Sequence, residues 1–332
     1  MEFEHKGSNR HPSLWVQISF RFLGFFLLSS CIPQPTLMPT SSPPPPPTPT
    51  PIVYTVTGDL LEQVYQLEDF MPLAKSGNYV VPTNEERAAY SKIISSLEAE
   101  DLALASELSG GHGYTLLRFL DLGDEKKASY LLKEGNPVSK GWGLYLLREE
   151  ITNNIIIEAP HPLSDKQTDL IALEIYRALD ARALLIAGAH RDANENGKAD
   201  VAHSTKSVFQ AVHETLIGKT PAFSGVPVVL QIHGFTAKKR TGYPNVILGF
   251  GKTTSAPEIA VAKELVNALT VRGLKADMCV DDSWQDLCGK KNVQGASKGQ
   301  AIFIHIELDE TARADNSILV AALSQVFSEQ KP

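Results

Sequence analysis

The feature that most constrains the fold is an alternation of short apolar segments and amphipathic segments in the second half of the chain. Apolar runs of this length are typical of strands buried on both faces, and the amphipathic runs are typical of helices. The strands are expected at 154–159, 183–187, 226–232, 245–250, 276–280 and 301–306, and the helices at 168–179, 204–216, 257–272 and 312–327. This order predicts an α/β fold whose sheet is mostly parallel or mixed, with helices on both faces.

The first half of the folded part has a different order of expected helices and strands. Residues 53–110 are expected to be mainly helical, with stretches at 60–67 and 83–108, and Thr83 and Glu86 form a capping-box pattern at the start of the longer one. Three strand-like segments at 114–120, 128–132 and 143–147 then indicate an antiparallel portion. We therefore expect a helical segment over 53–110, followed by a catalytic domain over 111–330.

The N-terminus has the pattern of an export signal. Basic residues precede an apolar run at 22–28, which ends in Ser29, Ser30 and Cys31. The run is too short for a membrane-spanning helix, which needs about 20 residues. Residues 28–31 resemble the bacterial lipobox, in which the cysteine is lipidated, and stable anchoring needs several acyl chains, such as palmitate. We predict a signal peptide at 1–30 and a lipid-anchored, extracytoplasmic protein; an ordinary signal peptide or a buried segment with an incidental cysteine is the alternative.

Residues 31–52 are expected to be a tether. Ten prolines lie between Pro33 and Pro51, and five of them, Pro43 to Pro47, are consecutive. Proline-rich sequence of this kind cannot build a packed core and favours extended polyproline II. The segment therefore predicts a spacer between a membrane and the folded domain.

The other two cysteines agree with export. If Cys31 carries lipid, Cys279 and Cys288 remain as a pair nine positions apart. In an oxidising compartment such a pair is expected to form a disulfide that fixes the loop around Trp284. Free thiols or metal ligation are the alternatives, although two cysteines without a CxxC pattern argue against a cysteine-type zinc site.

Composition and missing motifs exclude several functions. The formal net charge of −7, with no basic stripe, argues against nucleic acid as a partner. The sequence has no G-x-S-x-G nucleophile elbow, no P-loop and no Rossmann glycine pattern. A serine hydrolase and a nucleotide-dependent enzyme are therefore both disfavoured.

Residues that can bind metal or catalyse gather after the expected strands. Ligands of open α/β sheets bind beyond the carboxyl ends of the strands. The residues at or just after these ends are Glu158, His161, Asp165, His190, Arg191, His233, Glu307 and Asp309. Each has an ordinary structural explanation alone: Glu158 could be an internal ion-pair partner, and His203 and His213, which lie before or on a helix, are expected to be structural. The convergence on one edge of the sheet is what indicates a functional site.

Two histidines and a carboxylate suit a catalytic zinc with one open position. His161, Asp165 and His233 fit the metal ligands, and Glu307 fits a general base. Arg191 fits a cation that stabilises an oxyanion or clamps a substrate carboxylate, and His190 with Arg191 is expected to contact substrate.

The ordered motifs resemble those of the zinc carboxypeptidase-like superfamily, in the branch of N-formylglutamate amidohydrolases and poly-γ-glutamate hydrolases. The motifs are residues 158–161 with Asp165 and Thr168, then 188–191, 231–234 and 305–307. The resemblance implies zinc ligands at His161, Asp165 and His233 and a base at Glu307. One departure is that zinc carboxypeptidases have the acidic ligand three residues after the first histidine, where this chain has Ser164, so Glu158 or Asp169 could replace Asp165.

A second motif follows Arg191. Asp192, Asn194, Asn196 and Asp200, with Gly197 between them, match positions 1, 3, 5, 9 and 6 of an EF-hand-type calcium loop. Position 12 is His203 instead of an acid. A calcium site, a simple polar turn and a substrate-rim role all remain open.

The leading hypothesis is a membrane-anchored, zinc-dependent hydrolase of amide bonds. The expected substrates are peptides, γ-glutamyl chains or N-acyl amino acids, including material from the cell wall. The alternative is a non-catalytic lipoprotein that uses the same cleft to bind a ligand or a metal.

Overall fold

The structure is a computed structural model, and it describes residues 53–135, 138–218, 225–280 and 283–328. The predictions for residues 1–52, which include the signal peptide, the lipidated Cys31 and the tether, lie outside the described residues. The described residues all belong to one unit, Pro49–Pro332.

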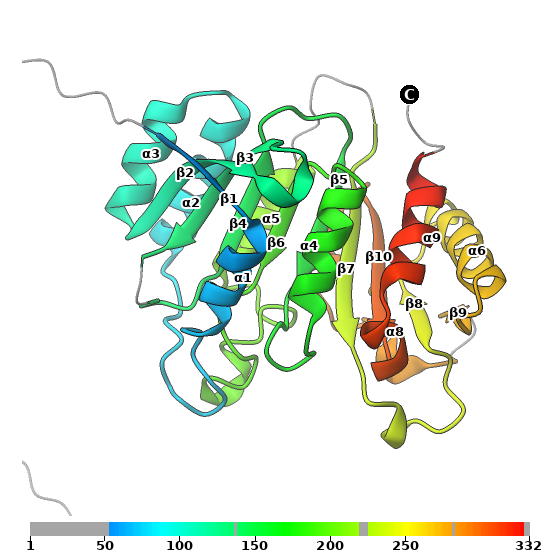
Figure 1. The fold of residues 1–332 in the computed structure, drawn as a ribbon. Coiled ribbons are helices and arrows are strands. Elements are labelled where there is room, and N and C mark those ends of the chain that lie inside the picture. The colour runs from blue at the N-terminus through cyan, green and yellow to red at the C-terminus, as the bar shows by residue number, and fades with distance from the viewer. Residues whose placement is uncertain (1–52, 136–137, 219–224, 281–282, 329–332) are drawn as a thin grey trace, which may run out of the picture. The chain divides into compact units, whose positions relative to one another are not determined.

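A mixed sheet of 10 strands runs through the described part of the chain (Figure 1). The strands are β1 (Tyr54–Gly58), β2 (Tyr114–Asp121), β3 (Ala128–Glu134), β4 (Leu144–Arg148), β5 (Ile155–Ala159), β6 (Ala183–Ile186), β7 (Val228–Gly234), β8 (Val246–Gly249), β9 (Ala276–Met278) and β10 (Ile302–Leu308). Their spatial order is β1-β2-β3-β4-β6-β5-β7-β10-β8-β9. The predicted α/β fold with a mixed sheet is confirmed.

The sheet has a parallel centre and a partly antiparallel periphery. Strands β6, β5, β7 and β10 are parallel to one another, which requires a crossover between successive strands. The apolar, unalternating sequences of these strands reflect burial on both faces. Strands β2, β3 and β4 form the antiparallel portion expected from the sequence, and β4 pairs with β6, so this portion extends the same sheet.

Helices cover both faces, as predicted. The helices are α1 (Leu60–Glu68), α2 (Asn84–Glu98), α3 (Leu102–Gly111), α4 (Thr168–Ala178), α5 (Val208–Gly218), α6 (Ala256–Val271), α7 (Val293–Ser297), α8 (Glu310–Ala314) and α9 (Ser317–Ser328). One hydrophobic cluster joins the sheet to α1, α4, α6 and α9, and a second joins its other face to α2, α3 and α5 (Figure 1). We call these the α4 face and the α5 face.

The two faces differ most along β7 and β10. On the α4 face these strands bury aliphatic side chains throughout, for example Leu230, Ile232 and Ile306. Because successive residues of a strand point to opposite faces, the residues between them point to the α5 face. Towards the carboxyl ends, those residues are polar: Gln231 and His233 on β7, and His305 and Glu307 on β10.

The N-terminal part differs from the expectation in two ways. The segment 53–110 holds three helices, but it also holds strand β1, which pairs in parallel with β2. The helix expected over 83–108 begins with the predicted capping box at Thr83 and then breaks between α2 and α3, where Glu100 has a φ of 59° and Asp101 caps α3. A residue in the left-handed region ends many helices, but it is usually glycine, so Glu100 gave no such signal in the sequence.

Two other helices also differ at their boundaries. The helix expected from 204 begins at Val208, and the one expected over 312–327 is divided into α8 and α9. Within the described ranges, no helix has the length and apolar character needed to cross a membrane.

Candidate active site

A pocket of about 390 Å³ lies at the carboxyl ends of β7 and β10. Its lining includes His161, Asp165, Arg191, His233 and Glu307, all of which the sequence predicted for a site. The linking segments after β5 and β6, the end of β7 and the residues after β9 provide its walls. The convergence at one edge of the sheet, expected from strand ends alone, is therefore present in the structure.

The register of the central strands explains why the polar residues meet. Glu307 of β10 lies opposite His233 of β7, and His305 lies opposite Gln231. Glu158 of β5 lies opposite Gln231 on the other side. Since directly opposite residues of neighbouring strands share a face, these side chains form two adjacent rows on the α5 face.

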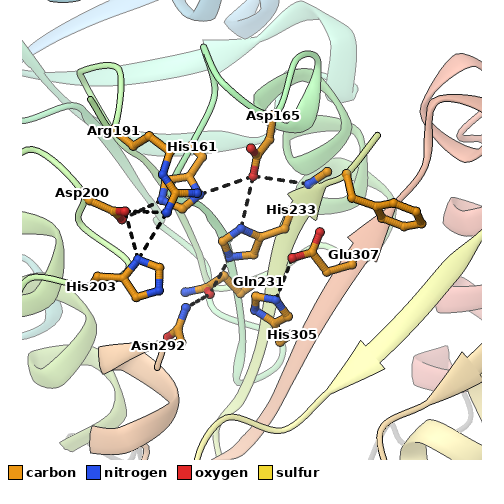
Figure 2. A network of polar contacts seen from close by, with 12 residues as sticks. His161, Asp165, Arg191, Asp200, His203, Gln231, His233, Asn292, His305 and Glu307 are labelled. Atoms are coloured by element: carbon orange, nitrogen blue, oxygen red, sulfur yellow. Dashed lines mark hydrogen bonds and ion pairs between the residues drawn. The ribbon is translucent and has the colours of Figure 1, made fainter. Parts of the chain in front are cut away.

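Asp165 lies between the two predicted histidine ligands (Figure 2). After β5 the chain turns, and the Asp165 backbone N–H donates to the His161 carbonyl at 2.8 Å, which returns the side chain of Asp165 towards His161. Oδ2 of Asp165 is 3.3 Å from Nδ1 of His161 and 3.2 Å from Nδ1 of His233. The backbone N–H of Gly234 donates to the same oxygen at 3.3 Å.

These three residues fit a zinc ion. Tetrahedral coordination with bonds of about 2.0–2.1 Å separates neighbouring ligand atoms by about 3.3 Å. The separations of Asp165 from the two histidines match this value, and the three ligand atoms all lie within 4.8 Å of one another. All three residues are buried, and two nitrogens with one carboxylate oxygen are a donor set that zinc prefers.

The structure also discriminates among the acidic residues that the sequence offered as ligands. Glu158 is fully buried and bonds to His213 and Gln231, and Asp169 is buried in α4 beside Glu68. Asp165 is the acidic residue that contacts both histidines.

The carboxylate of Asp200 contacts the ring nitrogen of His161 that faces away from Asp165. Nε2 of His161 is 2.8 Å from Oδ1 of Asp200, so the ring donates from Nε2 and presents Nδ1 towards Asp165. Burial alone would lower the pKa of His161, but hydrogen bonds to Asp165 and Asp200 outweigh it and raise the pKa to about 9. Burial opposes ionisation of Asp165 and Asp200 as well, yet bonds to the histidines hold both pKa values well below their usual range. Zinc at this site would therefore replace a proton on Nδ1 of His161.

A second group of potential ligands overlaps the first. His233, His305 and Glu307 also have ligand atoms within 4.8 Å of one another. However, Nδ1 of His233 faces Asp165 at 3.2 Å and its Nε2 is 2.8 Å from Oε1 of Gln231, so both nitrogens are engaged. The second group keeps only two independent ligands, which argues for one metal and not two.

Glu307 is held by His305 instead. Nε2 of His305 is 3.1 Å from Oε1 of Glu307, and the imidazole rings of His305 and His233 have centroids 4.2 Å apart. Among the described residues Oε2 of Glu307 has no hydrogen-bond partner, and Glu307 lines the pocket. Gly289 has a φ of 65° and a Cβ there would lie 2.9 Å from the His305 ring, so this position requires glycine.

Arg191 lies beside the candidate metal site. Its Nη2 donates to Asp200 at 2.6 Å, and its Nη1 is 3.4 Å from Nδ1 of His161. His203, which we expected to be structural, also contacts Asp200, at 2.9 Å, and lines the pocket.

His190 does not line the pocket. Its Nδ1 accepts the backbone N–H of Asp192 at 3.0 Å within its own loop, so the expected substrate contact by His190 has no support in the geometry. His190 was predicted as a site residue because it follows a strand. The chain turns back after β6, however, and Arg191 lines the pocket instead.

The calcium-loop interpretation of residues 192–200 is also corrected. Both polar atoms of the Asn194 side chain bond to the backbone of Tyr79, at 3.2 and 2.7 Å. Both oxygens of Asp200 face His161, Arg191 and His203. Two of the expected oxygen ligands therefore serve the candidate active site or the neighbouring loop, and Asp192 and Asn196 alone cannot make a calcium site.

Cys279 and Cys288 form the predicted disulfide. The segment that it closes, with the residues just after it, contributes Asp286, Leu287 and Gly289 to one wall of the pocket. Trp284 packs edge-on against Tyr243, with ring centroids 4.7 Å apart. The disulfide thus fixes a wall of the site, which the cysteine spacing alone did not indicate.

Gln231, His305 and Asp200 were named within motifs of the sequence, but their contacts with the residues of the metal site were not predicted. Gln231 and His305 each lie two residues before a predicted site residue on the same strand, and the period of two could have identified both. Asp200 offered no such signal, because its contact with His161 spans 39 residues and depends on how the intervening loop folds.

Comparisons with known proteins give distant structural likenesses. No protein-family model matches the sequence, and no curated protein sequence matches it. A bacteriophage poly-γ-glutamate hydrolase is 13% identical, with 55% of this chain and 86% of that chain covered and a TM-score of 0.37. A metallo-carboxypeptidase from Burkholderia cenocepacia is 12% identical, with 68% of each chain covered and a TM-score of 0.36.

The D,L-carboxypeptidase Csd4 from Helicobacter pylori is 10% identical, with 53% of this chain and 50% of that chain covered and a TM-score of 0.36. The motifs predicted a likeness to poly-γ-glutamate hydrolases and zinc carboxypeptidases, and a poly-γ-glutamate hydrolase and a metallo-carboxypeptidase are among the proteins that match. Because the identities and TM-scores are low, we base the proposed function on the residues of the site.

Proposed function

We propose that this protein is a zinc-dependent hydrolase of amide bonds. The observation that carries the proposal is the spacing of Nδ1 of His161, Oδ2 of Asp165 and Nδ1 of His233, which suits one tetrahedral zinc, in a pocket that Glu307 also lines. Three protein ligands leave one coordination position for water or substrate, which is the arrangement of a catalytic site and not of a structural one.

Each residue has a role that follows from its position. The chemistry that a zinc ion would supply here is polarisation of the amide carbonyl and activation of water. Glu307, with one oxygen fixed by His305, accepts the proton of the attacking water at its other oxygen and passes it to the leaving amine nitrogen. Arg191 supplies a positive charge to a developing oxyanion or a substrate carboxylate after separation from Asp200.

The location and the substrate are further parts of the proposal. The lipobox-like sequence at Cys31 and the proline-rich tether support an extracytoplasmic, lipid-anchored protein. Such a location favours substrates within reach of a membrane surface, such as wall-derived peptides or γ-glutamyl chains. The motif resemblance and the polar character of the pocket residues support the same substrate class.

The test combines metal analysis with one conservative substitution. We expect about one zinc per chain, and we expect Glu307→Gln to retain zinc while kcat for peptide, γ-glutamyl or N-acyl amide hydrolysis falls by about 10²–10⁴-fold. The control is Glu264→Gln, which removes the same charge from the exposed side of α6 and should leave kcat unchanged.

Two results would contradict the proposal. Hydrolysis by Glu307→Gln at the wild-type rate would remove Glu307 from the mechanism. Bound zinc without hydrolysis of any of these amide classes would favour the alternative, a lipoprotein that binds a ligand or metal in the same pocket.

A further inference from the structure

The identity of the metal ligands does not determine which ring nitrogen of His233 carries the proton. A neutral imidazole carries its proton on either Nδ1 or Nε2, and only an unprotonated Nδ1 can bind a metal next to Asp165. For His161 the choice is made by the carboxylate of Asp200, which only accepts hydrogen bonds. For His233 the contact at Nε2 is the side-chain amide of Gln231, at 2.8 Å, and an amide can either donate or accept.

One backbone carbonyl fixes the orientation of that amide from one side. The carbonyl of Val201 can only accept, so the group of Gln294 that lies 2.9 Å from it must be the NH₂ group. The oxygen of Gln294 therefore faces Gln231, at 3.3 Å from its Nε2. Gln231 must then present its own NH₂ group to Gln294 and its oxygen in the opposite direction.

One backbone N–H fixes the same orientation from the other side. The N–H of Gly295 can only donate, so the group of Asn292 that lies 3.0 Å from it must be the oxygen. The NH₂ group of Asn292 then donates to Gln231, which must present its oxygen, Oε1. Two independent backbone groups thus require that Oε1 of Gln231 faces His233.

A buried carboxylate agrees with this orientation. Oε2 of Glu158 accepts from Nε2 of Gln231 at 2.8 Å, and its Oε1 is 2.7 Å from Nδ1 of His213. His213, predicted to be structural, is thus the far end of a chain of contacts that runs through Glu158 and Gln231 to His233. Figure 2 shows the last links of this network, where Gln231 and Asn292 lie below the ring of His233.

The burial of the network makes a purely structural explanation costly. Glu158, His213, Gln231 and Gln294 are all 0% exposed, on a face of the sheet that is otherwise apolar between α5 and the strands. Burying polar groups gains little stability even when they are paired, and apolar residues of similar volume often serve as well. Packing alone does not require these buried polar residues, but a role in setting the protonation of His233 would explain them.

We propose that Gln231 is a positioning residue that fixes the protonated nitrogen of His233 as Nε2, and so presents an unprotonated Nδ1 to the metal. The inference rests on the metal site of the proposed function. Gln231 acts through His233 and contacts neither metal nor substrate. Residues of this kind, which hold the far side of a ligand, typically change metal affinity by 10- to 100-fold.

The first test reads the two ring nitrogens directly in the full chain loaded with zinc, because without the metal the carboxylate of Asp165, 3.2 Å away, competes for the proton at Nδ1. We expect the ¹⁵N chemical shifts of the His233 ring to show a protonated Nε2 and a metal-bound Nδ1, with the resonances assigned by their loss in His233→Gln. Metal bound through Nε2, with the proton on Nδ1, would overturn the proposal.

The second test uses a pair of matched variants. Gln231→Met keeps the side-chain volume but removes the acceptor of the Nε2 proton, so we expect a zinc Kd that is raised by about 10- to 100-fold in competition with a chelator. The control is Gln210→Met. Gln210 is 2% exposed and bonds to Gln294, but the carbonyl of Val201 still orients Gln294 without it, so the tautomer should persist and Kd should change by less than about threefold.

The outcomes separate this inference from the proposed function. Unchanged zinc affinity in Gln231→Met, or an equal loss in Gln210→Met, would overturn the positioning role whether or not the protein hydrolyses amides. The expected tautomer and Kd pattern in a protein without hydrolytic activity would support the positioning role and contradict the enzymatic proposal.

Discussion

The α4 face and the α5 face of the central strands have different roles, although alternate residues of the same strands form both. On β10, Ile304 and Ile306 point to the α4 face and pack in an apolar core, whereas His305 and Glu307 point to the α5 face and meet His233. The period of two in a strand separates fold and chemistry along one short sequence. The comparison predicts that substitutions on the α4 face change stability, and that substitutions on the α5 face near the pocket change metal binding.

The largest effect is expected for a metal ligand on the pocket side. His161→Ala removes one of three ligands, so zinc content should fall from about one ion per chain to almost none, measured by elemental analysis after gel filtration. The matched control is His203→Ala, because His203 also contacts Asp200 and lines the pocket but belongs to neither group of potential ligands. Retained zinc in His161→Ala, or equal loss in both variants, would remove His161 from the metal site.

The next effect is expected on the α4 face and should concern stability alone. Ile171 of α4 is 1% exposed in the apolar cluster, so Ile171→Ala should lower the free energy of unfolding by about 2–5 kcal/mol. Zinc affinity of the folded protein should stay at the wild-type value. Denaturant unfolding and chelator competition on the same samples would check both, and a parallel loss of zinc affinity would show that the two faces are not independent.

A smaller change in stability, of opposite sign, is expected when an acidic group buried on the α4 face is replaced. Asp169 of α4 is 0% exposed, and burial, with the nearby Glu68, raises its pKa from 3.8 to about 7. The folded state therefore keeps a proton that the unfolded chain has lost, so this group's stabilising contribution is lost as the pH rises from about 4 to about 7. Asp169→Asn, which does not titrate, should unfold at a higher temperature than wild type above pH 7.

The gain should be on the order of 2–4 kcal/mol above pH 7 and should shrink towards pH 4. The control is Glu174→Gln, which changes an exposed carboxylate of the same helix and should leave the pH profile of the melting temperature unchanged. A gain that does not depend on pH would mean that ionisation of Asp169 is not its cause.

The fold was largely predictable because its signals are local. Buried parallel strands need continuous apolar runs, and amphipathic helices need their own period, so the segments from β5 to β10 were identified from sequence. Strand β1 was missed because its residues are mostly exposed and carry no apolar run. Its position at the edge of the sheet depends on pairing with β2, more than 50 residues away.

The site was predictable only in part. His161, Asp165, His233 and Glu307 were identified because each lies at or just after an apolar strand, and the register then brings them together. The contacts of Asp200 with His161 and of Asn292 with Gln231 could not be predicted, since loops with no periodic pattern bring these residues together. For the same reason the loop at 192–200 resembled a calcium site: its spacing of oxygens was visible, but their partners were not.

The central claim is that His161, Asp165 and His233 hold one zinc ion, and anomalous diffraction at the zinc edge tests it most directly. Crystals of the zinc-loaded protein should show one anomalous peak, bonded to Nδ1 of His161, an oxygen of Asp165 and Nδ1 of His233 at about 2.0–2.2 Å. A peak bonded to His305 and Glu307 instead, or no peak within reach of His161, would contradict the account.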